Sequence, residues 1–125
     1  MTTKDIGDIG ERFAAKHLKK CGYKIKGRNR HFSHNELDII AEDKKYIVFV
    51  EVKTRSVSSD DKIDQTSPAS AVTYSKQSRL ITAANDYIRS THTLKQPRMD
   101  VIEIWINKET RKLIKINHIQ DAYGV

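Results

Sequence analysis

Apolar residues in the first part of the chain recur every three or four positions. This spacing places them on one face of an amphipathic helix over residues 5–20, and Gly22 follows as a stop signal. Glu11 lies at the margin of this face, where its carboxylate can point into water or inward. The apolar positions are Ile6, Ile9, Phe13, Ala14 and Leu18.

Strand patterns follow this helix. They fall at residues 23–28, 36–40 and 46–52, and the last two are joined by the polar turn 42–45 into a β-hairpin. The third run is apolar and β-branched or aromatic, which is typical of a strand buried on both faces. Because successive strand residues point to opposite faces, Glu51 and Lys53 share a face with Ile47 and Phe49. The hairpin therefore places two opposite charges at the end of a buried strand.

Residues 54–68 are rich in Ser, Asp and Lys and show no periodicity, which predicts a mobile loop. Ser67 and Pro68 are the candidate N-cap and first-turn proline of a second helix that runs to about Arg89. Lys76 falls in the middle of its apolar stripe, where a lysine either extends its amine to solvent or serves a buried partner. The stripe consists of Val72, Lys76, Leu80, Ala84 and Ile88.

The last third of the chain contains two more apolar runs, at residues 99–106 and 113–119, separated by a turn at 107–110. The predicted order is helix, three strands, helix, two strands. A helical crossover after a three-strand meander favours a mixed sheet, in which the strand after the crossover is parallel to one before it and connected with a right hand. We therefore predict a single α/β domain with a central sheet of about five strands and two main helices.

Charge and composition limit the partners. The chain has 125 residues, with 23 Lys and Arg against 16 Asp and Glu, so its net charge is +7. This excess favours a polyanion such as nucleic acid, although a protein can be basic without binding one. The single cysteine, Cys21, cannot form an internal disulfide and is expected to be a small core residue.

The beginning of the sequence lacks the apolar core of a signal peptide, and no run of apolar residues is long enough to cross a membrane. We therefore expect a cytoplasmic protein without a membrane partner.

The hairpin also predicts a pair of carboxylates that could bind a metal ion. Asp38 and Glu51 can meet across it, and two adjacent carboxylates cannot both remain ionised cheaply without a cation. Oxygen ligands alone select Mg²⁺ or Mn²⁺ over zinc. Lys53 would then lie near the attacking water and the scissile phosphate. The alternative is a structural ion pair at the end of a strand.

The series Asp38…Glu51-Val52-Lys53 resembles the PD-(D/E)XK nuclease signature. The wider set Gly10-Glu11, Gly22-Tyr23, Arg28-Asn29, Glu36-Leu37-Asp38, Val48–Arg55, Lys76-Gln77 and Pro97–Val101 resembles the YraN-like family of predicted endonucleases, which are similar to archaeal Holliday-junction resolvases.

This resemblance implies a restriction-endonuclease-like core. It implies that Asp38 and Glu51 ligate a metal, that Glu11 supports the metal or its water, that Lys53 assists the water, and that Lys76 or Gln77 completes the site.

The sequence departs from the family pattern before the Glu-Leu-Asp segment. Asn35 stands where the family usually has glycine. Asparagine tolerates positive φ better than most residues, so the turn is expected to survive.

We therefore expect a Mg²⁺-dependent endonuclease that hydrolyses DNA backbone phosphodiesters, with branched DNA as a candidate substrate. The resemblance also suggests a homodimer. One alternative is a non-catalytic nucleic-acid-binding module with the same fold, and another is an interaction domain whose charges form salt bridges. Candidate phosphate contacts are Arg28, Arg30, Arg55 and Lys62.

Overall fold

The computed structural model describes residues 2–32, 34–58 and 72–124. The elements occur in the order expected from the sequence, with three strands between the two helices and two strands after the second. They are α1 (Thr3–Lys20), β1 (Lys24–Phe32), β2 (Asn35–Glu42), β3 (Tyr46–Val57), α2 (Tyr74–Thr91), β4 (Gln96–Asn107) and β5 (Leu113–Tyr123).

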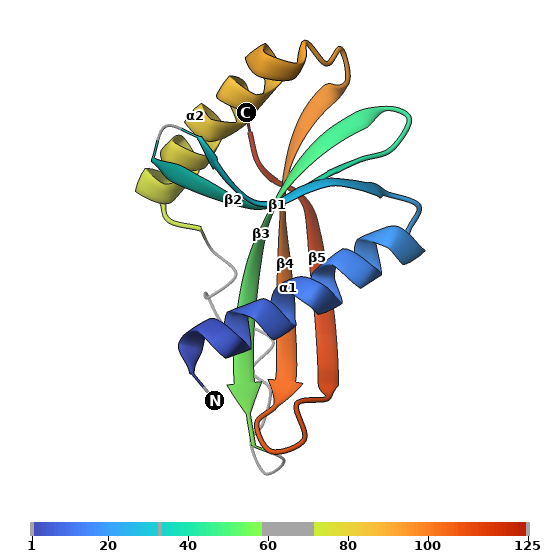
Figure 1. Cartoon of the computed structure of the whole chain (residues 1–125), viewed down its shortest axis with the longest axis vertical. Coiled ribbons are helices and arrows are strands. Elements are labelled where there is room, and N and C mark those ends of the chain that lie inside the picture. Colours follow the sequence, from blue (N-terminus) through green and yellow to red (C-terminus); the bar gives the residue numbers. More distant parts are fainter. Residues whose placement is uncertain (1, 33, 59–71, 125) are drawn as a thin grey trace.

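The strands form one mixed sheet in the order β1-β2-β3-β4-β5. Neighbouring strands are antiparallel except β3 and β4, which the α2 crossover makes parallel. The predicted mixed sheet is thereby confirmed. In Figure 1, α1 crosses the sheet in front of β3, β4 and β5, while α2 lies near β1 and β2.

The two sides of the sheet bury different side chains. Val48 and Val50 of β3 pack in a cluster with apolar residues of α1, whereas Ile47 and Phe49 pack in a second cluster with α2. This alternation follows from the twofold period of a strand that is covered on both faces. It also fixes the side on which Glu51 projects, which is the α2 side.

Helix α1 begins with a capping box, in which Thr2 and Asp5 exchange side chain to backbone hydrogen bonds. It lies very close to β3 at Gly10, because a Cβ atom added there would stand 1.8 Å from Thr54 Oγ1. This contact places the adjacent Glu11 beside the sheet. The prediction for Cys21 was wrong, since the residue forms the C-cap of α1 and its side chain is exposed rather than packed in the core.

Helix α2 begins later than predicted. Its N-cap is Thr73, whose hydroxyl accepts a hydrogen bond from the Lys76 N–H, and residues 72 and 73 are not helical. Ser67 therefore cannot cap this helix, because the favourable hydroxyl is six residues further along. Ser67 and Pro68 themselves lie outside the described residues.

The predicted loop also begins later, because β3 continues to Val57 by pairing with β4 as far as Asn107. The first strand is longer than predicted as well and extends to Phe32.

The β2–β3 ladder ends at the pair Ile39 and Val50. Extending the same register by one residue would put Asp38 opposite Glu51. Instead, the backbone N–H of Val52 donates a hydrogen bond of 2.9 Å to Asp38 Oδ2. A side chain thus replaces the strand partner at the point where β2 and β3 separate.

Candidate functional site

Asp38 and Glu51 lie together where β2 and β3 separate, as the hairpin register predicts. Both line the same open cavity on the α2 side of the sheet. Glu51 is only 6 % exposed, so one of these two carboxylates is almost removed from bulk water.

Their proximity changes the protonation of Asp38. Burial, and then the charge of Glu51, raise the pKa of Asp38 to about 8, although the Val52 N–H hydrogen bond acts in the opposite direction. Desolvation and a like charge both favour the neutral form of a carboxylic acid. The site therefore holds a carboxyl group that a nearby cation would convert to its ionised form.

Lys76 provides a cation on one side of this pair. Its Nζ atom donates to Glu51 Oε1 at 2.5 Å, across from α2 to β3. Lys76 thus points from its apolar helix stripe toward the sheet, although its side chain remains 39 % exposed. Among the described contacts Lys76 pairs with Glu51 and not with Asp38, which accepts a hydrogen bond from the Val52 N–H.

The cavity has a volume of about 310 Å³. Five of its eight lining residues were not predicted as site residues, and of these Arg79 brings a second α2 cation to the cavity. Its position one turn after Lys76 was a usable signal, because residues three apart on a helix are neighbours. The lining residues are His34, Asn35, Glu36, Asp38, Glu51, Lys76, Arg79 and Leu80.

The turn before β2 differs from the prediction in one detail. His34 has φ of 66°, while Asn35 is not among the described residues with positive φ. The left-handed conformation expected at Asn35 is therefore taken one residue earlier. The turn still directs β2 into the site.

Glu11 lies beside the site but does not line the cavity. Its Oε2 atom is buried and accepts no hydrogen bond from the described residues, with Arg28 Nη2 at 3.9 Å. Burial raises the pKa of Glu11, against the lowering effects of Asn29 and Arg28. Its charge contributes to the electrostatics of Asp38 from the direction of α1. A direct role for Glu11 at a metal stays a prediction.

Lys53 and Gln77 do not line the cavity either. Lys53 follows Glu51 on β3, is partly exposed and pairs in register with Glu103. Gln77 Nε2 donates to the Val72 carbonyl at 2.9 Å, which engages its amide in the backbone before α2. Of the two α2 residues considered for the site, the structure brings Lys76 to the carboxylates.

The candidate phosphate contacts are spread over two strands. Arg28 and Arg30 lie on β1, where Arg30 stacks over Phe32 at 5.7 Å, and Arg55 lies on β3. Lys62 lies outside the described residues. DNA contact by these residues stays a prediction.

A second buried acidic group was missed. Asp100 of β4 is 0 % exposed and accepts hydrogen bonds from Arg98, from His118 Nε2 and from the Asp121 N–H. The spacing Arg98-x-Asp100 within a buried strand was a signal, because residues two apart on a strand share a face. His118 could not have been found in this way, since it comes from β5.

The donor set of the open site suits a small, hard cation. Within the described residues no three His, Cys, Asp or Glu side chains are grouped to hold a metal, so protein ligation here would rest on the two carboxylates. Mg²⁺ commonly takes one or two carboxylates and completes its shell with water and phosphate. Asp38 and Glu51 fit this requirement, because among the described ion pairs Lys76 pairs with Glu51 and not with Asp38.

Fold and site together define a mixed α/β protein with a carboxylate pair where two strands separate. A model of the uncharacterised protein family UPF0102 matches residues 10–104, and the chain belongs to that family. It is 41 % identical over 121 residues to a UPF0102 protein of Caldanaerobacter subterraneus subsp. tengcongensis, covering 96 % of this chain and 95 % of that one.

Two further relatives extend this similarity. A UPF0102 protein of Clostridium botulinum strain Hall is 42 % identical over 106 residues, covering 83 % of this chain and 82 % of its own. One of Chlorobaculum tepidum is 39 % identical over 127 residues, covering 96 % and 92 %. Neither described helix is long and apolar enough to cross a membrane.

Proposed function

We propose that the protein is a metal-dependent DNA endonuclease with a restriction-endonuclease-like, PD-(D/E)XK core. The observation that carries the proposal is the pairing of Asp38 and Glu51 at an open cavity, with the pKa of Asp38 raised by its neighbour. A purely structural ion pair would balance both carboxylates, whereas here Lys76 pairs with Glu51. Such an unbalanced pair is typical of a functional site.

Each residue has a role in this proposal. Asp38 and Glu51 would hold Mg²⁺ or Mn²⁺, which supplies Lewis-acid polarisation of the phosphate and lowers the pKa of water. Lys76 and Lys53 would offset the negative charge that builds on the phosphate oxygens. Hydrolysis consumes one water and breaks one P–O bond, leaving a phosphate monoester and a hydroxyl group.

DNA binding would depend on the basic residues around this site. Arg28 and Arg30 on β1, Arg55 on β3 and Arg79 on α2 are suited to phosphate contacts, which would make affinity fall with increasing salt. The net charge of +7 supports a polyanionic substrate. By the resemblance to Holliday-junction resolvases, branched DNA is the first substrate to test.

The test is cleavage of labelled four-way junctions, flaps and plain duplex with Mg²⁺ or Mn²⁺. Wild type should cut, while Glu51→Gln and Asp38→Asn should lose at least about a hundredfold in rate. Glu109→Gln, the same chemical change at an exposed turn residue, should cut like wild type. Equal cutting by wild type and Glu51→Gln would refute this site.

A non-catalytic nucleic-acid-binding module is the second candidate. It is favoured by the Lys76–Glu51 ion pair, which already neutralises one carboxylate without a metal. It predicts salt-dependent DNA binding with no cleavage and no heat of Mn²⁺ binding. Calorimetry with Mn²⁺ therefore separates the two candidates.

A further inference from the structure

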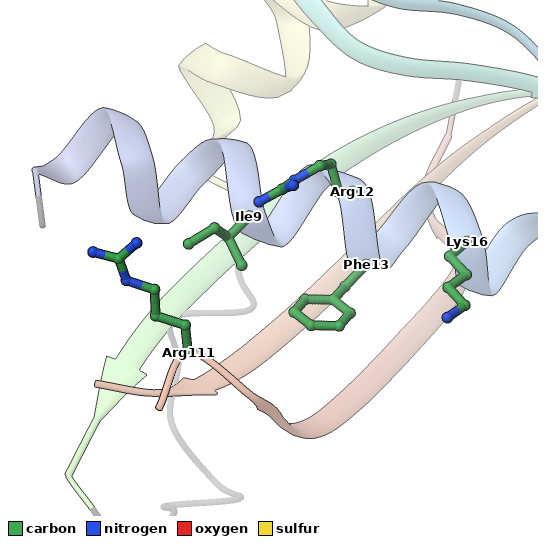
Figure 2. Close-up of a pocket in the computed structure, with 5 residues that line it drawn as sticks. All are labelled: Ile9, Arg12, Phe13, Lys16 and Arg111. Atoms are coloured by element: carbon green, nitrogen blue, oxygen red, sulfur yellow. The ribbon is translucent and has the colours of Figure 1, made fainter. Parts of the chain in front are cut away.

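A second cavity, of about 280 Å³, lies on the other side of the sheet beside α1. It is lined by Ile9, Arg12, Phe13, Lys16 and Arg111. Arg12 and Phe13 are adjacent on α1 and each lies three or four residues from both Ile9 and Lys16, so the four side chains occupy one stretch of its surface. The fifth comes from the turn between β4 and β5 (Figure 2).

The turn holds Arg111 in a defined position. The Arg111 N–H donates to the Asn107 carbonyl at 2.8 Å, and Asn107 Oδ1 accepts from the N–H groups of Glu109 and Thr110. Arg111 itself has φ of 61°, a conformation that turns the chain back toward β5. Figure 2 shows its side chain rising toward α1, where Ile9 and Phe13 project on the same side of the helix.

This cavity is lined by both positively charged and apolar side chains. Arg12, Lys16 and Arg111 bring three positive charges, and none of them is in an ion pair described for this chain. The pKa of Asp5, which is exposed at the start of α1, is lowered mainly by hydrogen bonds with Thr2 and least by the charge of Arg111. Ile9 and Phe13 supply an apolar wall between the cations.

A small inorganic anion would contact only the positively charged side chains of this cavity. A nucleoside phosphate would use both parts, because its phosphate accepts bidentate hydrogen bonds from arginine and its base packs against an aromatic ring. The cavity is close to the lower end of the range of about 300–1,000 Å³ that is usual for small-ligand sites. One nucleotide unit therefore suits it better than a larger ligand.

We propose that this cavity is a binding site for a nucleoside phosphate, either free or within a nucleic-acid strand. Arg12 and Arg111 contact the phosphate, while Ile9 and Phe13 contact the base or the sugar. Lys16, on the other side of Phe13 from Arg111, adds positive charge at the far end of the cavity (Figure 2). The proposal does not depend on cleavage, since the cavity is lined by neither Asp38 nor Glu51. A strand held here would add an anchor on the α1 side of the sheet.

The test is calorimetry of the full chain in EDTA, which removes divalent ions, with dAMP, deoxyadenosine, inorganic phosphate and an oligonucleotide of deoxyadenosines. We expect dAMP or the oligonucleotide to bind saturably, at least about tenfold tighter than phosphate or deoxyadenosine. Tighter binding of dAMP would identify the free nucleotide as the ligand, and tighter binding of the oligonucleotide would identify the strand.

Variants connect the binding to the cavity. Arg12→Gln and Arg111→Gln should each weaken binding about tenfold. Lys19→Gln, with the same loss of charge on α1 outside the cavity, should match wild type. Phe13→Leu, checked for an unchanged Tm, should weaken dAMP more than phosphate. Equal affinities for phosphate and dAMP, no saturable binding, or binding unaffected by Arg12→Gln and Arg111→Gln would each overturn the proposal.

Discussion

Asp100 and Asp38 are acidic residues in the same sheet with opposite surroundings. Asp100 is completely buried, yet hydrogen bonds from His118, Arg98 and Asp121 outweigh the effect of burial and lower its pKa. Asp38 receives the Val52 N–H and faces Glu51, and its pKa is raised. Burial alone therefore does not decide whether the pKa of a carboxyl group in this sheet is raised or lowered. Asp100 and Asp38 differ in how many hydrogen-bond donors the protein directs at the carboxylate.

The Asp100 cluster continues outward to α1. His118 Nδ1 lies 3.2 Å from His17 Nε2, so β4, β5 and α1 meet through polar groups under the C-terminal end of the helix. The contacts from Asp100 to His118 and from His118 to His17 thus connect α1 to the sheet.

The largest effect expected from this comparison is that of Asp100→Asn. The amide would place an N–H group against donors and leave the guanidinium of Arg98, which is 7 % exposed, without its carboxylate. Removing one member of a buried ion pair costs about 3–5 kcal/mol. Urea unfolding should show this loss near neutral pH.

The pH dependence of this effect has a definite sign. A carboxyl whose folded-state pKa is lowered stabilises the protein above its unfolded pKa, and this stabilisation is lost as pH falls through the folded value. The cost of Asp100→Asn should therefore shrink in acid. Asp121→Asn, the same change at an exposed residue, should stay within about 0.5 kcal/mol of wild type, and an equal loss in both variants would contradict the role of Asp100.

Asp38→Asn should act in the opposite direction and stabilise the fold. An uncharged amide can still accept from the Val52 N–H through its oxygen, and it removes the repulsion with Glu51. Because the pKa is raised from 3.8 to about 8, Asp38 costs stability only where the unfolded chain is ionised, above about pH 4, and the cost grows until about pH 8.

The expected gain is of order 1–3 kcal/mol at pH 8 and close to zero at pH 4. Thermal unfolding at both pH values measures it. A destabilised variant, or a gain of equal size at both pH values, would show that Asp38 is already balanced by the protein and would remove its contrast with Asp100.

The same contrast explains how much the sequence alone could predict. The order of elements and the meeting of Asp38 with Glu51 follow from local periodicity and one hairpin register, so both were predictable. The Asp100–His118–His17 cluster joins residues as far as 101 positions apart, and no local pattern contains that contact. The start of α2 was misplaced because a serine–proline pair is a good cap by composition, while tertiary packing of Val72 and Leu80 sets where the helix docks.

Lys76→Gln should change the free energy of unfolding less than Asp100→Asn or Asp38→Asn does. It removes the partner of Glu51, but the Lys76 side chain is 39 % exposed, so solvent screens the ion pair and water can reach the carboxylate after substitution. We expect a loss of about 1 kcal/mol or less in urea unfolding, and less at high salt. Arg98→Gln is the matched comparison at the buried pair, and its loss should be several times larger and nearly independent of salt. If Lys76→Gln costs as much as Arg98→Gln, Glu51 is held as firmly as Asp100, and the carboxylate pair belongs to the structural framework instead of an open cation site.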